Sequence, residues 1–211
     1  MHAIISAGGD PPDPRWTPEL DGDLFIAADS GLSHFVALGR RADLIIGDMD
    51  SVDPAQLAAA VEHGSHIERH PGDKDATDLE LALHAAVKAG AQRVTVIGAG
   101  GGRLDHFAAN LALLTAPDWK LVDVVAFIGA ARVTVVRSSA EVTGVLGSIV
   151  TLLAATVPAR GVTTTGMRWS LNDATLNPGS THGVSNELVA TRATVSITTG
   201  ALLAIQPMGG Q

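Results

Sequence analysis

The chain has 211 residues, a hydrophobic content of 46% and a formal net charge of −8. This length accommodates one large domain or two small ones, and the apolar content is sufficient for a core, which excludes a globally disordered protein. No cluster of lysine and arginine marks a nucleic-acid-binding face, cysteine is absent, and no apolar run approaches the length of a membrane span. We therefore expect a soluble cytoplasmic protein that binds neither nucleic acid nor membranes. With this acidic charge, any phosphate ligand would be bound through metal ions, and a cationic small molecule would suit the chain as well.

The first part of the chain alternates short apolar runs with segments of helical spacing. The apolar runs predict strands at residues 3–6, 24–28, 44–47, 94–98 and 122–128. The segments between them predict helices at residues 30–40, 52–64, 77–90 and 103–115. The runs are continuous rather than alternating, as in strands that are covered on both faces. We therefore expect a mostly parallel α/β domain over residues 1–128.

The pattern changes after that point. Residues 129–211 contain runs rich in valine, threonine and isoleucine, with glycines between them and no convincing helical pattern. Such a pattern is typical of an antiparallel β-sandwich or small barrel. The predicted fold is thus α/β plus all-β, in two domains.

Acidic residues follow the predicted strands of the first domain. Asp29 directly follows one strand, Asp48 and Asp50 follow the next, and Asp75 and Asp78 stand at the start of a predicted helix. Ligands of open parallel sheets bind beyond the carboxyl ends of the strands. Gathered carboxylates repel one another unless a hard cation neutralises them, and Mg²⁺ binds carboxylates together with substrate phosphates. We expect a magnesium site on Asp48, Asp50 and Asp75.

Simpler explanations exist for some of these acids. Asp75 or Thr77 can cap the following helix, and Thr77 with Glu80 forms a capping box. An acidic pair in a turn, such as Asp48 and Asp50, is usually just solvated. The convergence of several acidic groups on one edge favours the metal site.

A glycine run, "GAGGGR", lies between a predicted strand and a helix that carries Asp105 near its start. Glycines at such a place expose backbone N–H groups to phosphate, although a tight turn explains the run equally well. The pattern is not that of a P-loop. The expected phosphate-binding residues are Gly98, Gly100, Gly101, Gly102 and Arg103.

Trp169 is the one aromatic residue of the predicted β domain. It could belong to the core, or it could stack on a flat or cationic ligand. Ser185 and Asn186 offer hydrogen-bonding groups further along, in a segment that could also be a plain turn.

Together these segments resemble the thiamine pyrophosphokinase family, in family order and over nearly the whole chain. The matching blocks are "ADSG" (28–31), "DLIIGDMDSV" (43–52), "PGDKDATDLELAL" (71–83), "GAGGGRLDHFAANLALL" (98–114), "GMRWSL" (166–171) and "GVSNEL" (183–188). The chain departs from the family pattern at "ADSGLS", where the family often has "ADGGAN", and at Met49, where an aromatic residue is usual.

The resemblance implies a nucleotide-binding domain followed by a thiamine-binding domain, in a homodimer that binds thiamine where subunits and domains meet. It implies Mg²⁺-dependent transfer of the pyrophosphoryl group of ATP to thiamine, giving thiamine diphosphate and AMP. The implied ATP-binding residues include Asp29, Ser51 and Lys74, besides the glycine run. Asp78 or Asp105 would orient the thiamine hydroxyl or accept its proton, and Asp105 would also bind thiamine, as would Trp169, Ser185 and Asn186.

Two alternatives remain open from the sequence. A pyrophosphokinase acting on a hydroxymethylpterin would share the acidic and nucleotide-binding half of the chain. A non-catalytic nucleotide-binding regulator would share the whole scaffold.

Overall fold

The computed structural model describes residues 1–207. It divides into two compact units, here called unit 1 and unit 2. Unit 1 consists of Met1–Asn110 and Leu121–Gly129, whereas unit 2 consists of Leu111–Lys120 and the chain from Ala130 onward. The fold is mixed α/β, as expected from the alternation of patterns along the sequence.

Unit 1 is built on a sheet in which all paired strands run parallel, in the order β6-β5-β1-β2-β3-β4. The strands are β1 (His2–Ser6), β2 (Leu24–Ala28), β3 (Leu44–Gly47), β4 (His66–Arg69), β5 (Arg93–Ile97) and β6 (Asp123–Ile128). The central strands β1 and β5 are buried at every position but the first. This confirms the parallel sheet predicted from continuous apolar runs. The edge strand β4 is mostly exposed and lacks such a run.

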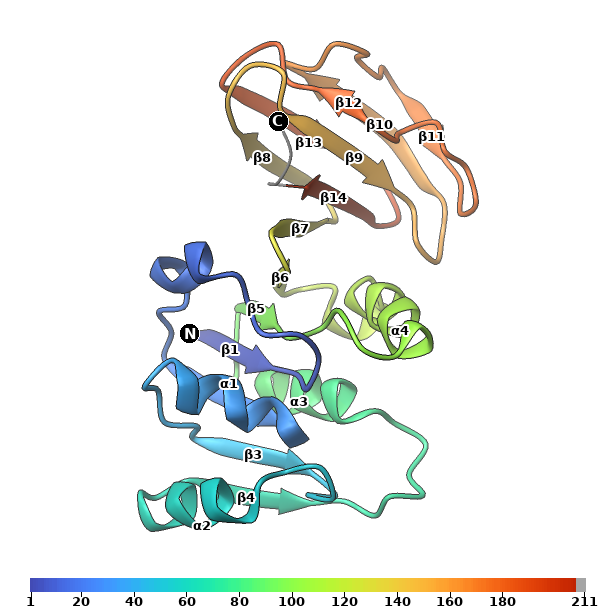
Figure 1. Ribbon diagram of the computed structural model, residues 1–211. Coiled ribbons are helices and arrows are strands. Elements are labelled where there is room, and N and C mark those ends of the chain that lie inside the picture. Colours follow the sequence, from blue (N-terminus) through green and yellow to red (C-terminus); the bar gives the residue numbers. More distant parts are fainter. Residues whose placement is uncertain (208–211) are drawn as a thin grey trace. The chain divides into compact units, whose positions relative to one another are not determined.

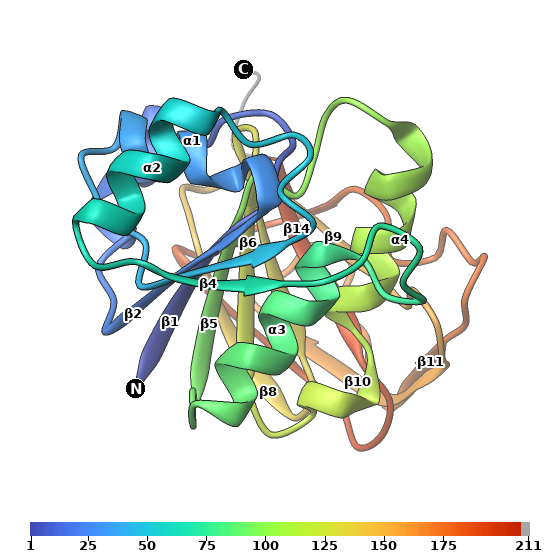
Figure 2. The same ribbon diagram turned by 90° about the horizontal axis from the view of Figure 1, so that it is seen from below.

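Helices connect these strands on both faces of the sheet. The helices are α1 (Leu32–Ala37), α2 (Pro54–Glu62), α3 (Asp78–Lys88) and α4 (Leu104–Leu114), with 3₁₀ turns at Pro14–Glu19, Asp29–Gly31 and Pro117–Trp119. Figure 2 shows α1 and α2 on one face and α3 on the other. That placement follows from right-handed crossovers, because β4 to β5 returns across the sheet in the opposite direction.

Local capping places the helix starts near the carboxyl edge of the sheet. Asp53 accepts hydrogen bonds from the backbone of α2, and Pro54 occupies the first helical position. Thr77 accepts a hydrogen bond from the backbone N–H of Glu80, so it is the N-cap of α3. The capping prediction is therefore confirmed for Thr77, and Asp78 is the first residue of the helix.

The 3₁₀ turn at Pro14–Glu19 closes one side of the unit 1 core. Trp16 is buried, stacks on Phe127 with 4.3 Å between ring centroids, and donates its indole N–H to the carbonyl oxygen of Gly129. This short turn thus contributes a large aromatic side chain to the core.

Unit 2 contains two antiparallel sheets, of order β12-β9-β14-β7 and β11-β10-β13-β8. Its strands are β7 (Ala131–Val136), β8 (Ser139–Thr143), β9 (Ile149–Leu153), β10 (Ala159–Thr165), β11 (Ala174–Leu176), β12 (Asn186–Glu187), β13 (Arg192–Ser196) and β14 (Leu202–Pro207). Small and branched apolar side chains such as Val150, Leu152, Val162 and Val195 form its core. The antiparallel β structure predicted for this part is present (Figure 1). Among residues 1–207, no helix is long and apolar enough to cross a membrane.

Candidate functional site

A pocket of about 630 Å³ opens in unit 1 among the segments that follow strands β1, β2, β3 and β5 and the first turns of α3 and α4. This is the carboxyl edge of the parallel sheet, where ligands of such sheets bind. The predicted site residues that line the pocket are Asp29, Asp48, Asp50, Ser51, Lys74, Asp78, Gly98, Gly100, Gly101, Gly102 and Arg103. Asp75 and Asp105 are exposed and do not line it.

Three carboxylates meet in this pocket. Asp29, Asp48 and Asp50 each offer an oxygen atom, and these atoms lie within 4.8 Å of one another. Asp29 is buried, and its Oδ1 atom has no hydrogen-bond partner. Burial raises the pKa of Asp29, and the charges of Asp78, Asp48 and Asp50 raise it further. A buried carboxylate oxygen beside two other acids fits a hard divalent cation, which binds oxygen ligands and offsets their repulsion.

The backbone around these acids is strained. Asp29 has φ +47° and Met49 has φ +67°, a left-handed conformation that is uncommon outside glycine and asparagine. The Met49 side chain packs against the unit 1 core, while the flanking Asp48 and Asp50 face the pocket. Backbone strain of this kind clusters at functional sites. Within three consecutive residues, the turn thus directs the apolar Met49 side chain to the core and the two flanking carboxylates to the pocket.

Lys74 lies between two of the acidic groups. Its Nζ atom is 2.9 Å from Oδ1 of Asp78 and 3.6 Å from Oδ2 of Asp48. The pKa of Asp48 is lowered, first by the hydrogen bond that it accepts from the backbone N–H of Asp50 and then by the charge of Lys74. Lys74 thus offsets part of the negative charge of the pocket. Asp75, the expected third metal ligand, lies outside the group of three carboxylates, and its metal role stays a prediction.

Two backbone segments are joined at the floor of the pocket. Gly9 donates its N–H to the carbonyl oxygen of Gly98, and Asp10 donates to that of Gly100, both at 2.7 Å. Gly101 has φ +79°, and a Cβ atom there would collide with the Asp10 carboxylate. The glycine run is therefore required by the turn itself, while it also lines the pocket. The segment around Gly9 carries no recognisable motif, so sequence reasoning missed it.

Arg103 and Asp105 form an ion pair at the start of α4. The guanidinium Nη2 is 2.6 Å from Oδ2 of Asp105, and Nε donates to Oδ1 at 3.1 Å. Hydrogen bonds from Arg103 lower the pKa of Asp105 to about 2. A carboxylate with so low a pKa is a poor proton acceptor near neutral pH. In this arrangement Arg103 contacts both carboxylate oxygens of Asp105, and the role of Asp105 as a proton acceptor stays a prediction.

The Trp169 residue of unit 2 has 54% of its surface exposed to solvent, so the interpretation as a core residue is wrong. Asn186 is buried and holds the Trp169 backbone from both sides: its Oδ1 accepts from the Trp169 N–H at 3.1 Å, and its Nδ2 donates to the Trp169 carbonyl at 2.7 Å. The Arg168 guanidinium lies 5.0 Å from the indole centroid and pairs with Glu187 at 2.9 Å. Ser185 is exposed, with φ +59°. The exposed indole is thus carried by a backbone segment that the Asn186 side chain holds through two hydrogen bonds.

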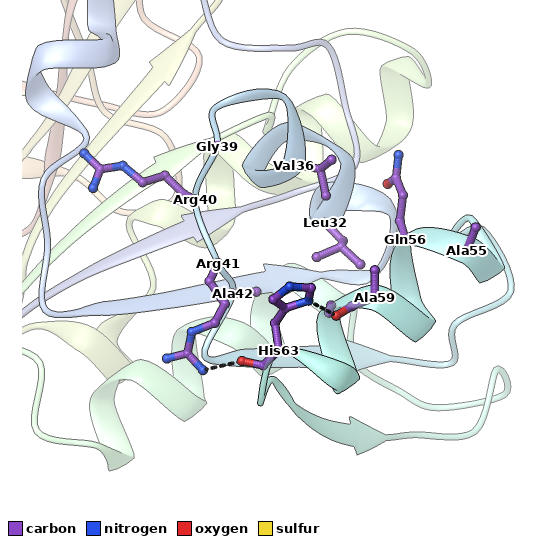
Figure 3. Close-up of a pocket in the computed structure, with 11 residues that line it drawn as sticks. Leu32, Val36, Gly39, Arg40, Arg41, Ala42, Ala55, Gln56, Ala59 and His63 are labelled. Carbon is purple, nitrogen blue, oxygen red and sulfur yellow. Dashed lines mark hydrogen bonds between the residues drawn. The ribbon is translucent and has the colours of Figure 1, made fainter.

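A second hollow of about 570 Å³ lies between α1 and α2 (Figure 3). Leu32 and Val36 from α1 face Ala59 from α2, and the Nδ1 atom of His63 donates a hydrogen bond to the Ala59 carbonyl oxygen at 2.6 Å. Arg41 contacts the His63 carbonyl at 3.5 Å. No carboxylate lines this hollow, so it lacks the acidic oxygen ligands that a hard divalent cation such as Mg²⁺ prefers.

The fold and the first pocket define a class. A glycine-lined pocket with clustered carboxylates, at the carboxyl edge of a parallel sheet, is typical of proteins that bind phosphorylated ligands together with a divalent cation. The family model of the thiamin pyrophosphokinase catalytic domain matches residues 20–126, and that of the thiamin pyrophosphokinase vitamin B1 binding domain matches residues 134–202. The chain belongs to the thiamin pyrophosphokinase family.

Individual relatives agree with this assignment. The chain is 26% identical over 202 residues to thiamine pyrophosphokinase of Bacillus subtilis (strain 168), covering 90% of this chain and 92% of that protein. It is 28% identical over 208 residues to thiamine pyrophosphokinase 2 of Oryza sativa subsp. japonica, covering 86% and 78% of the two chains. Its fold is similar to the crystal structure of thiamine pyrophosphokinase from Bacillus subtilis, with a TM-score of 0.86, 25% identity and full coverage of both chains.

Proposed function

We propose that this chain transfers the pyrophosphoryl group of ATP to the hydroxyl of thiamine, giving thiamine diphosphate and AMP. The observation that supports this most strongly is the cluster of Asp29, Asp48 and Asp50 in the same pocket as the glycine turn. Pyrophosphoryl transfer is catalysed mainly by positioning and by neutralising phosphate charge, and this pocket offers groups for both. The matched families give no support to a pterin substrate or to a non-catalytic regulator.

Asp29, Asp48 and Asp50 would hold Mg²⁺. When bound, the ion neutralises charge on the ATP oxygens and polarises the attacked phosphorus. The buried, unpaired Oδ1 of Asp29 supports its inclusion as a ligand, beyond the set that the sequence suggested. Backbone N–H groups of the glycine turn, with Lys74, Ser51 and Arg103, would hold the phosphates. Arg103 can serve there by exchanging its Asp105 partner for a phosphate oxygen.

Asp78 is the better candidate for orienting the thiamine hydroxyl and accepting its proton. It lines the pocket next to Lys74, whereas Asp105 does not line it and is held as a carboxylate of low pKa by Arg103. An Asp105 contact with thiamine remains part of the proposal, because its helix begins at the pocket.

We assign ATP binding to residues 1–128 and thiamine binding to residues 129–211. The exposed indole of Trp169 would stack on the flat, cationic thiamine, and the Ser185 hydroxyl is available for a hydrogen bond. Both polar atoms of the Asn186 side chain already bond the Trp169 backbone. Asn186 would therefore contribute to thiamine binding mainly by holding Trp169 in place.

We also propose a homodimer with active sites near the subunit interface. Exposed apolar side chains gather around the turn before β9 and the end of β12, namely Val145, Leu146, Ile149 and Val189. Backbone hydrogen bonds between Gly147, Ser148 and Leu188 hold these two segments together. An apolar group of this kind is typical of a protein interface. Cytoplasmic localisation stays a prediction from the composition.

Incubation of the purified protein with ATP and Mg²⁺, plus either thiamine or a hydroxymethylpterin, tests the function. We expect AMP and thiamine diphosphate to form with thiamine only. AMP formation with the pterin alone would establish the related pyrophosphokinase, and ATP binding without AMP formation from either acceptor would establish a regulator.

A further inference from the structure

One buried histidine of unit 1 has no part in the chemistry above. His34 lies in α1, and its Nδ1 atom is 3.1 Å from the hydroxyl of Ser6, at the end of β1. Ser6 is fully buried and His34 nearly so. Buried polar side chains are rarely retained without a partner, and here each is the partner of the other. The pair joins α1 to the end of the central strand β1, next to Ala7, which lines the pocket.

The His34 ring also supports both backbone segments of the pocket floor. A Cβ atom on Gly98 would lie 2.8 Å from Cε1 and 2.9 Å from Nδ1 of His34, so the ring touches the glycine backbone. Burial lowers the pKa of His34, and backbone hydrogen bonds at Gly9 and Ala7 partly oppose this lowering. Ala7, Gly9 and Gly98 all line the pocket.

The helix that carries His34 also begins at the acidic group. The 3₁₀ turn Asp29–Gly31 leads directly into α1, so His34 is linked within two turns of helix to the buried carboxylate of Asp29. From the helix that follows the acidic group, the ring thus contacts both Ser6 and the backbone of the glycine turn.

We propose that His34 is a positioning residue for nucleotide binding, which holds the two pocket-floor segments in register with the acidic group. It contacts neither phosphate nor metal and acts through Ala7, Gly9 and Gly98. This inference rests on the proposed function, in which the pocket binds ATP.

Two near-isosteric variants separate hydrogen bonding from packing. His34→Leu removes every polar atom, whereas His34→Asn keeps one near the Nδ1 position and can still pair with Ser6. Ser6→Ala removes the same hydrogen bond from the other side. We expect calorimetry with Mg²⁺ and ATP to show a dissociation constant about tenfold higher for His34→Leu, because small misplacements of binding groups lose affinity steeply. His34→Asn should restore most of the affinity.

His2 provides a matched control. It lies at the other end of β1, its Nε2 atom is 2.8 Å from the hydroxyl of Thr95, and it does not line the pocket. His2→Leu therefore removes a similar histidine–hydroxyl bond from the same strand. We expect a lower melting temperature but an ATP dissociation constant within about twofold of the wild type, since a lost neutral hydrogen bond affects mainly stability.

The outcomes separate the inference from the proposed function. If the wild type does not bind ATP, the proposed function fails and the inference with it. If the wild type binds ATP and folded His34→Asn, His34→Leu and Ser6→Ala all bind it equally well, only the positioning role is overturned. Should His34→Leu fail to fold, Ser6→Ala and His34→Asn still decide. The positioning role requires that Ser6→Ala bind ATP more weakly than the wild type. If Ser6→Ala and His34→Asn lose no more ATP affinity than the control His2→Leu, the role is refuted.

Discussion

The two units present their candidate ligand-binding groups in opposite ways. Unit 1 concentrates carboxylates at the ends of parallel strands, on strained backbone and partly out of water, with Asp29 buried and Met49 left-handed. Unit 2 exposes a single indole on an antiparallel framework, with Trp169 held through its backbone by Asn186. A site for highly charged phosphates demands groups that repel one another, whereas a site for a flat cation demands only a supported aromatic face.

This difference has an energetic consequence. Like charges at close range destabilise the folded chain until a cation binds, so the unit 1 site opposes folding. The exposed Trp169 side chain buries little surface, so it neither stabilises nor destabilises the folded chain by much. Removal of the buried Asp29 carboxylate should therefore reduce activity without reducing stability, because the pKa of this group is raised in the folded chain. Removal of the Trp169 indole should change affinity with little effect on either catalysis or folding.

The largest expected effect is the loss of turnover in Asp29→Asn, Asp48→Asn and Asp50→Asn. Each should lower kcat by orders of magnitude, because a metal ligand is lost while the shape is kept. For Asp29→Asn the melting temperature without metal should stay equal or rise, since the raised pKa of Asp29 shows that its charge opposes folding. Asp48→Asn should not gain stability, because the pKa of Asp48 is lowered by its hydrogen bond to the Asp50 backbone and by Lys74. Asparagine also tolerates the left-handed backbone at position 29. AMP release and thermal unfolding measure the two quantities.

Asp53→Asn is the matched control for these three variants. Asp53 caps α2 and lies outside the carboxylate group, and asparagine is an equally good cap. It should keep wild-type turnover. Near wild-type kcat at saturating Mg²⁺ in any of the three test variants would remove that residue from the metal site.

The second expected effect concerns the unit 2 site. Trp169→Ala should raise the KM for thiamine about five- to thirtyfold with little change in the KM for ATP, because a stacking contact is worth about 1–2 kcal/mol. Trp169→Tyr should keep most activity, since a ring face survives. Because the indole is exposed, the melting temperature should change little. An equal rise in the KM values for thiamine and for ATP would show that Trp169 does not serve thiamine alone, and that the proposed division between the two units is wrong.

The smallest expected effect is a pH dependence of stability that originates in unit 1. Burial lowers the pKa of His34, so on acidification the unfolded chain takes up a proton before the folded one. The free energy of unfolding should therefore fall as pH drops below the ordinary histidine value of about 6.5, down to the lowered folded pKa. The pKa of His2 is also lowered by burial and adds in the same direction.

Urea unfolding of the wild type and His34→Asn between about pH 5 and pH 8 measures this term. The variant should lose less stability on acidification, and the remaining slope should belong in part to His2. Equal slopes in the two proteins would show that His34 carries a proton in the folded state as easily as in the unfolded one.

Much of the fold could be predicted from local sequence. Continuous apolar runs identify β1, β2, β3, β5 and β6, because strands covered on both faces must be apolar throughout. Thr77 and Glu80 identify the start of α3, because capping is a contact between near neighbours. The edge strand β4 could not be found in this way, because its exposed side chains carry no apolar pattern.

The candidate site was predictable only in part. Asp48 and Asp50 follow a strand and are recognisable by position alone. Asp29 was expected to bind ATP, but its place in the carboxylate group depends on β2 and β3 lying side by side in register. Asp75 stands among acidic neighbours in the sequence and yet lies outside the group, since Thr77 turns the chain into α3.

The sequence by itself determined the buried strands, the helices between them and which residue types stand at strand ends, because apolar periodicity, capping and glycine turns are local properties. Tertiary structure alone decided which of those residues meet. His34 reaches Ser6 and Gly98 across 28 and 64 positions of the chain, and Asn186 supports Trp169 across 17. Such contacts arise from strand register and packing, which depend on the free energy of the whole core rather than on any segment of the chain.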